Sequence, residues 1–228
     1  MKATQFYSKL KNCKYRIFIL LVYTGLLLAC EPPVYYLSPQ PPDVKNLSDI
    51  PLEYTGSFMN LKDSSQITIS PDMVVQYEID YSIMTREQLY KELDTVIDHD
   101  TLVYIDPNWT LEINLIDDSA EYISRKEDTL FIAGTENYIR KWKDILFLNM
   151  HAGEGKWTVH ILKVYDDMLY FDELLKPSEI DSVKNIIEIK TFIDSTQNKI
   201  TEYNLDPTKK ELSQIMKHKE IHYSYARQ

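Results

Sequence analysis

Beyond residue 51, apolar residues recur mostly at every second position along the chain. Such alternation points successive side chains to opposite faces of an extended backbone, which is typical of half-buried β-strands. The clearest examples are residues 73–82, 101–105, 109–115, 129–133 and 157–164. The pattern therefore predicts a body built mainly from short strands.

Polar runs that carry glycine, proline or aspartate separate these strands in the way that turns do. They lie at residues 62–65, 106–108, 126–128, 152–155 and 166–167. Because such short connections join antiparallel neighbours, we expect hairpins and a meander.

One hairpin is predicted in detail, and it runs from residues 145–149 to residues 157–164 across a glycine-bearing turn. In its second strand Trp157, Val159 and Ile161 share the more apolar face, so we expect them to point inward. His160 then points outward or toward the mouth of a cavity.

Helical patterns are few. Thr85 and Gln88 form a capping-box signature, Pro177 opens a second short helix, and Asp206 with Pro207 is expected to begin a third.

A run of antiparallel strands must bury one face and protect its edges. The predicted fold is therefore mainly β, an antiparallel curled sheet or a partly closed barrel, with a few short helices that include one at the C-terminus.

The first thirty residues follow a different pattern. Residues 1–29 carry five basic and no acidic side chains, and an apolar run occupies residues 17–28. This run would make about 18 Å of helix, which is too short for a hydrocarbon core about 30 Å thick. The charge and length pattern is that of a signal peptide.

Leu27-Leu28-Ala29-Cys30 completes this segment and resembles the lipobox of bacterial lipoproteins. In that family the cysteine is lipidated and becomes the mature N-terminus after cleavage. The resemblance implies a lipid anchor at Cys30, which makes a membrane the first partner. It places the protein in the bacterial cell envelope, at the outer membrane on its periplasmic face or at the cell surface.

Proline content divides the rest of the chain. Residues 30–51 hold six of the ten prolines, which fix φ and remove backbone donors. We expect this segment to form an extended tether after the lipidated Cys30. Tyr35, Tyr36 and Leu37 leave a second possibility open, because such a cluster docks on a domain as easily as it stands in solvent. Residues 52–228 then form one strand-rich globular domain.

Charge and cysteine content restrict the kinds of partner and cofactor that the chain can bind. The chain has 35 acidic residues, and 20 of its 25 basic residues lie beyond the leader, so the mature part carries about 15 net negative charges. This charge repels nucleic acid, which we therefore do not expect as a partner. Cys13 lies in the leader and Cys30 at the anchor, so we expect no disulfide and no thiolate metal site. None of the glycines stands in phosphate-binding spacing, and no cofactor is predicted.

Candidate chemistry is sparse. Asp98-His99-Asp100 is best interpreted as a solvated turn, because neighbours in an extended chain point apart. His218 and His222 stand four residues apart, but Lys219 occupies the position at which a zincin has glutamate. The chain has no GxSxG elbow, and among so many acidic residues no carboxylate pair can be singled out. We therefore predict no metal site and no catalytic residue.

Trp142, residues 145–149 and Trp157 form a tryptophan-anchored hairpin among short alternating strands. Together with the lipobox, this arrangement resembles the lipocalin-like lipoproteins of Gram-negative bacteria. The Gly-x-Trp signature of the lipocalins has Gly56-Ser57-Phe58 as its counterpart, with phenylalanine in place of tryptophan. The resemblance implies a ligand pocket in a strand-built body.

A tripeptide of Asp, then Ser or Thr, then a small or apolar residue recurs six times. It resembles the acceptor motif of a general O-glycosylation system that modifies exported proteins in one group of Gram-negative bacteria. The same residue types also dominate turns and strand starts, because they hydrogen-bond the backbone. The resemblance implies modification at one or more of Thr95, Thr101, Ser119, Thr129, Ser182 and Ser195.

These patterns favour a membrane-anchored envelope lipoprotein with a non-catalytic binding or interaction domain, whose partner is a protein, a small molecule or a glycan. Two alternatives stay open. A hydrolase acting on envelope or other glycans would need an acidic cleft. A structural subunit of an envelope complex would show an exposed apolar patch instead of a pocket.

Overall fold

Strands dominate the structure, a computed structural model that describes residues 31–60, 62–93, 99–134, 136–196, 199–219 and 224–228. They join into one open sheet of 15 strands, and β1 with β14 is the one parallel pair among the described strands. The main path runs β13-β14-β1-β11-β12-β15-β3-β4-β5-β8-β7-β6, while β10, β9 and β2 extend it from β11. The mainly β fold with a few short helices is confirmed, and the sheet is open.

The elements have the following bounds. The first strands are β1 (Val34–Tyr36), β2 (Asn46–Leu47), β3 (Gly56–Met59), β4 (Gln66–Ile69), β5 (Met73–Thr85), β6 (Thr101–Asp106), β7 (Trp109–Ile116) and β8 (Ser119–Ile132). The remaining strands are β9 (Tyr138–Trp142), β10 (Ile145–His151), β11 (Trp157–Tyr165), β12 (Met168–Glu173), β13 (Ile189–Asp194), β14 (Lys199–Leu205) and β15 (Ser224–Arg227). The helices are η1 (Leu52–Tyr54), α2 (Arg86–Leu93), η2 (Pro177–Glu179), α3 (Ile180–Val183) and α4 (Lys209–His218).

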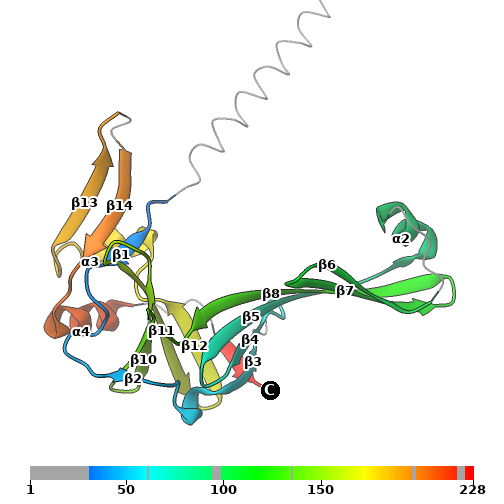
Figure 1. Cartoon of the computed structure of the whole chain (residues 1–228), viewed down its shortest axis with the longest axis horizontal. Helices are drawn as coiled ribbons and strands as arrows, with labels where there is room; N and C mark the ends of the chain where they lie inside the picture. The colour runs from blue at the N-terminus through cyan, green and yellow to red at the C-terminus, as the bar shows by residue number, and fades with distance from the viewer. Residues whose placement is uncertain (1–30, 61, 94–98, 135, 197–198, 220–223) are drawn as a thin grey trace, which may run out of the picture.

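Strands β9 to β12 form a central layer that has a hydrophobic core on each face. Side chains alternate along β10, so Phe147 enters one core while Leu146 and Leu148 enter the other. The first core, called the helix-side core, includes Val183 of α3 and Leu212 of α4. The second core lies between the central layer and strands β3 to β5, which Figure 1 shows on the other side of β11 and β12.

The predicted hairpin across the turn at residues 152–155 is confirmed as β10 and β11. The two strands pair antiparallel, with Asn149 opposite Val159. Trp157, Val159 and Ile161 are all buried in the helix-side core, as their shared apolar face predicts. The facing of β11 therefore follows from its alternation alone.

Four strands leave the body as a long arm (Figure 1). β5 pairs with β4 only as far as Tyr77, and beyond it β5, β8, β7 and β6 pair with one another. α2 packs on one face of this sheet, where Leu89 joins Ile113 and Ala120 in a small core separate from the other two. The arm, defined as residues 78–126, therefore has a core of its own.

The turn expected at residues 126–128 is wrong, because these residues lie inside β8. Glu127 pairs with Tyr77, and Asp128 pairs with Gln76. Both acidic side chains are exposed. Where a strand has solvent on its outer positions for several residues, charged side chains replace the apolar alternation, and the pattern then resembles a turn.

The predicted helix near the C-terminus is confirmed as α4, but its start and the chain end differ from expectation. The N-cap is Thr208, whose side chain forms a capping box with Glu211, and not Asp206 with Pro207 at the first helical position. After α4 the chain adds β15, which pairs with both β12 and β3. A strand and not a helix therefore ends the described chain.

The proline-rich segment packs into the domain from β1 onward, which corrects the expectation of an extended tether over residues 30–51. β1 lies between β14 and β11, and Tyr36 is only 1% exposed. The Asn149 side chain accepts a hydrogen bond from the Gln40 N–H and donates one to the Gln40 carbonyl. Arg140 donates to two further carbonyls of the segment. Prolines cannot donate, but their carbonyls accept, and the body supplies the donors.

Candidate functional site

A cavity opens where two strands share one edge of β11. β1 meets β11 at Trp157, and β12 pairs with it from His160 onward. The cavity between them has a volume of about 250 Å³ and is lined by Tyr36, His160, Glu173 and Pro177 among others. The change of partner strand along β11 therefore creates the hollow.

His160 and Glu173 face each other across β11 and β12, and both also line a second cavity of about 260 Å³. The His160 ring stacks on Phe171, with ring centroids 5.3 Å apart. Burial lowers the pKa of His160 to about 4, although Asp172 acts weakly in the opposite direction. Burial likewise raises the pKa of Glu173. His160 is therefore neutral at pH 7. It lies at a cavity, which was one of the two positions expected for it.

Tyr36 closes the first cavity from the side of β1. Its hydroxyl oxygen and the Nδ1 atom of His160 are buried and have no hydrogen-bond partner among the described residues. Burial, together with the carboxylates of Glu179 and Glu173, raises the pKa of Tyr36 well above its usual value. The cavity wall thus combines two neutral polar groups, on Tyr36 and His160, with the carboxyl group of Glu173.

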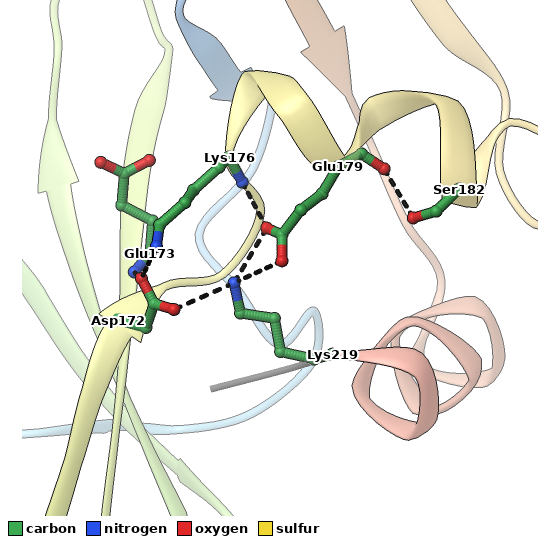
Figure 2. Close-up of polar contacts among 6 residues, drawn as sticks. All are labelled: Asp172, Glu173, Lys176, Glu179, Ser182 and Lys219. Carbon is green, nitrogen blue, oxygen red and sulfur yellow. Dashed lines mark hydrogen bonds and ion pairs between the residues drawn. The ribbon is translucent and has the colours of Figure 1, made fainter. Parts of the chain in front are cut away.

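A buried ion-pair network lies on the other face of β12, and Figure 2 shows Glu173 pointing away from it. The Nζ of Lys219, a side chain that is 1% exposed, lies 3.3 Å from Asp172 and 2.9 Å from Glu179. Lys176 Nζ lies 2.9 Å from the second Asp172 oxygen. Two lysines and two carboxylates neutralise one another here and tie β12, η2 and the end of α4 together.

The sequence patterns did not predict this network, and they left the packing of Tyr36 on the domain as one of two possibilities. The network joins residues up to 47 positions apart, so no local spacing signals it. Tyr36 carried a signal, because β-branched and aromatic residues at 34–36 favour a strand. The prolines on both sides of these residues favour an extended tether instead.

The remaining predicted site residues are scattered. Four of them lie outside the described residues: Cys30, Thr95, Asp98 and His222. Among the acceptor candidates, the side chains of Thr129, Ser182 and Ser195 are exposed, and those of Thr101 and Ser119 are half-buried at strand starts. Glycosylation stays a prediction at all six positions.

Asp100 and His218, two other candidate positions, take no part in the cavities or in the ion-pair network. Asp100 accepts a hydrogen bond from the Leu115 N–H at 2.8 Å, which fastens the start of β6 to β7. His218 is exposed in the last turn of α4. In the part of the chain that the structure describes, no group of three His, Cys, Asp or Glu side chains is placed to hold a metal ion.

A wider hollow of about 490 Å³ is lined by residues of the paired strands β2 and β9 and by Asp72 and Gly134 of two loops. Its lining includes a second carboxylate, Asp49, but neither His160 nor Glu173. None of the helices in the described ranges has the length and apolar character needed to cross a membrane.

Comparison of the chain with protein-family models, with curated proteins and with solved structures finds no match. The lipobox and the lipocalin-like resemblance therefore stay predictions.

Proposed function

We propose that this chain is a lipoprotein of the bacterial cell envelope, anchored through Cys30, whose domain is a non-catalytic interaction module. The signal-peptide pattern and the lipobox support the anchor. Because β1 begins at Val34, three residues separate Cys30 from the sheet, a reach of about 10 Å. The domain of an anchored chain would sit close to its membrane.

The observation that carries the interaction role is the open face of the arm. Tyr81, Ile83, Leu102 and Ile116 are 58%, 59%, 52% and 49% exposed, respectively. Grouped apolar exposure of this kind marks interaction surfaces. The two cavities at His160, of about 250 and 260 Å³, are smaller than the roughly 300–1,000 Å³ of typical ligand pockets, whereas the hollow beside β2 and β9, of about 490 Å³, falls within that range. The exposed patch is the feature on which we base the interaction role, and it also favours a subunit role in an envelope complex.

Membrane fractionation tests the anchor. Cys30→Ser should move the protein from the membrane to the soluble fraction or leave it with an uncleaved leader, because the acyl chains that supply the binding energy are lost. A Ser variant that needs detergent as the parent does, and that is cleaved at the same position, would contradict the lipoprotein assignment.

Site-specific photo-crosslinking in the host cells tests the arm. A photoreactive side chain in place of Ile83 should yield a discrete crosslinked product. The control position is Leu52 in η1, which is 77% exposed but lies on the body. The same products from both positions would contradict a role for the arm.

A further inference from the structure

The open face of the arm places carboxylates among apolar side chains. The strand register sets Tyr81 beside Ile123, Ile123 beside Glu112, and Glu112 beside Leu102. These four residues form a row across β5, β8, β7 and β6. Glu112 is exposed, so its carboxylate stands in solvent between two apolar neighbours.

The next row toward the far end of the arm repeats this mixture. Ile83 lies beside Glu121, and Glu121 lies beside Asn114. The Tyr81 hydroxyl donates a hydrogen bond of 2.6 Å to Glu121 Oε1, which holds that carboxylate on the face. α2 packs on the opposite face of the same sheet. Among the described residues, the arm therefore has one covered face and one open face.

Negative charge is concentrated on the arm. Residues 78–126 contain 12 acidic and 4 basic residues, whereas the rest of residues 31–228 contains 23 acidic and 16 basic residues. The arm thus carries a net charge of about −8 in 49 residues, and the remaining 149 residues carry about −7. A surface potential of one sign steers partners of the opposite sign.

This charge decides between possible occupants of the open face. Two copies of the chain meeting face to face would bring two strongly negative arms together, and anionic lipid headgroups would be repelled in the same way. Arg125 lies on the same face, beside Ile79 and Thr110 in the row nearer the body. An uncharged apolar partner would cover two carboxylates, those of Glu112 and Glu121, against this one cation, which is costly. A cationic segment would neutralise both carboxylates while its apolar residues cover the isoleucines.

We propose that the open face of the arm binds a cationic segment of a partner protein, in which lysine or arginine residues alternate with apolar residues. This inference rests on the proposed interaction function and adds the chemistry of the partner. Each cation reaches Glu112 or Glu121, and the apolar positions between the cations pack on Tyr81, Ile83 and Leu102.

Three synthetic peptides test the chemistry against the full mature protein in neutral detergent. Each peptide is extended, with valine at alternate positions, and the intervening positions are all lysine, all glutamine or all glutamate. The lysine peptide should bind, and its affinity should fall about tenfold or more between 50 and 200 mM salt, because screening weakens exposed ion pairs. The other two peptides should bind at least about tenfold more weakly.

Two matched double variants separate contact from long-range attraction. Glu112→Gln with Glu121→Gln removes two charges from the open face, and Glu78→Gln with Glu87→Gln removes two charges elsewhere on the arm. Glu78 pairs with Lys126 at 3.8 Å, and Glu87 lies in α2. The first variant should lose about tenfold in affinity for the lysine peptide and the second less than about threefold. Equal losses would overturn docking on this face.

Ile83→Asn distinguishes failure of this inference from failure of the proposed function. If the glutamine or glutamate peptide binds as tightly as the lysine peptide, and Ile83→Asn abolishes that binding, the arm is a docking face but its partner is not cationic. If no peptide binds, or if Ile83→Asn converts a dimer to a monomer in sedimentation, the inference is overturned. Crosslinking at position 83 then decides the interaction function independently.

Discussion

At the scale of single residues, the neutral His160 has a consequence for stability. Its pKa is lowered from 6.5 to about 4 by burial, so the unfolded chain binds this proton more readily than the folded one. The stability that depends on the neutral ring is present above about pH 6.5 and is lost as the pH falls toward 4. The raised pKa of Glu173 has the opposite effect on stability, because the contribution of its protonated form is lost as the pH rises above 4.5.

A His160→Gln variant isolates this effect, because Glu173 and the other carboxylates titrate in both proteins. Relative to the variant, the wild type should lose roughly 3 kcal/mol of unfolding free energy between pH 6.5 and pH 4, and little more below that. Urea unfolding at a series of pH values measures the difference. A difference that does not change with pH would show that His160 is solvated.

The buried Lys219 gives a second residue-scale prediction. Lys219→Met should destabilise the domain by about 3 kcal/mol, because Asp172 stays 1% exposed and loses one of its two lysine partners. Lys184→Met is the matched control, since its pair with Asp181 is exposed and should contribute less than about 0.5 kcal/mol. If the two variants have similar midpoints in urea unfolding, water reaches the network and the prediction is wrong.

At the scale of elements, β1 is the least expected strand and the one whose removal we expect to matter most. Tyr36→Ala should cost about 3–5 kcal/mol, because the side chain lies in the helix-side core. Tyr35→Ala on the neighbouring, half-buried position should cost about 1 kcal/mol or less. Limited proteolysis of the wild type should leave residues 34–51 intact. Cleavage there under native conditions would restore the tether interpretation.

Local patterns predicted the elements whose partners are close in sequence. The β10–β11 hairpin and its facing followed from alternation and one turn. The central pair of the candidate site was also within reach, because a two-residue turn at 166–167 places Tyr165 opposite Met168 and hence His160 opposite Glu173. Nearest-neighbour hairpins therefore carry their own register.

Long-range pairings could not be predicted in this way. β1 pairs with β14, so Val34 lies opposite Tyr203, and nothing near Val34 in the sequence specifies that partner. The wall that Tyr36 contributes to the cavity and the contact of Lys219 with Asp172 depend on the same kind of closure. The pairing of His160 with Glu173 could thus be predicted from the sequence, whereas the elements that enclose this pair could not.

At the scale of the whole molecule, the arm and the body should be separable. Replacing residues 79–125 by an Asn-Gly turn joins Glu78 to Lys126, which face each other in register. The body should still unfold in one cooperative transition, because neither of its cores includes a residue of that segment. Its urea m-value should fall, since less surface becomes exposed on unfolding. Loss of the cooperative transition would show that the arm is needed for the body to fold.

The position of β1 has a mechanical consequence. β1 is hydrogen-bonded on both edges, to β14 along its whole length and to β11 at Tyr36. If Cys30 is lipidated as proposed, a partner pulling on the domain transmits the load through the start of β1. A load that runs along the strand is resisted in shear by the backbone bonds on both edges together. Bonds loaded in this way break collectively, whereas the bonds of a hairpin pulled open at its ends break one at a time. Tension at the proposed anchor would therefore be shared between two neighbouring strands, β14 and β11.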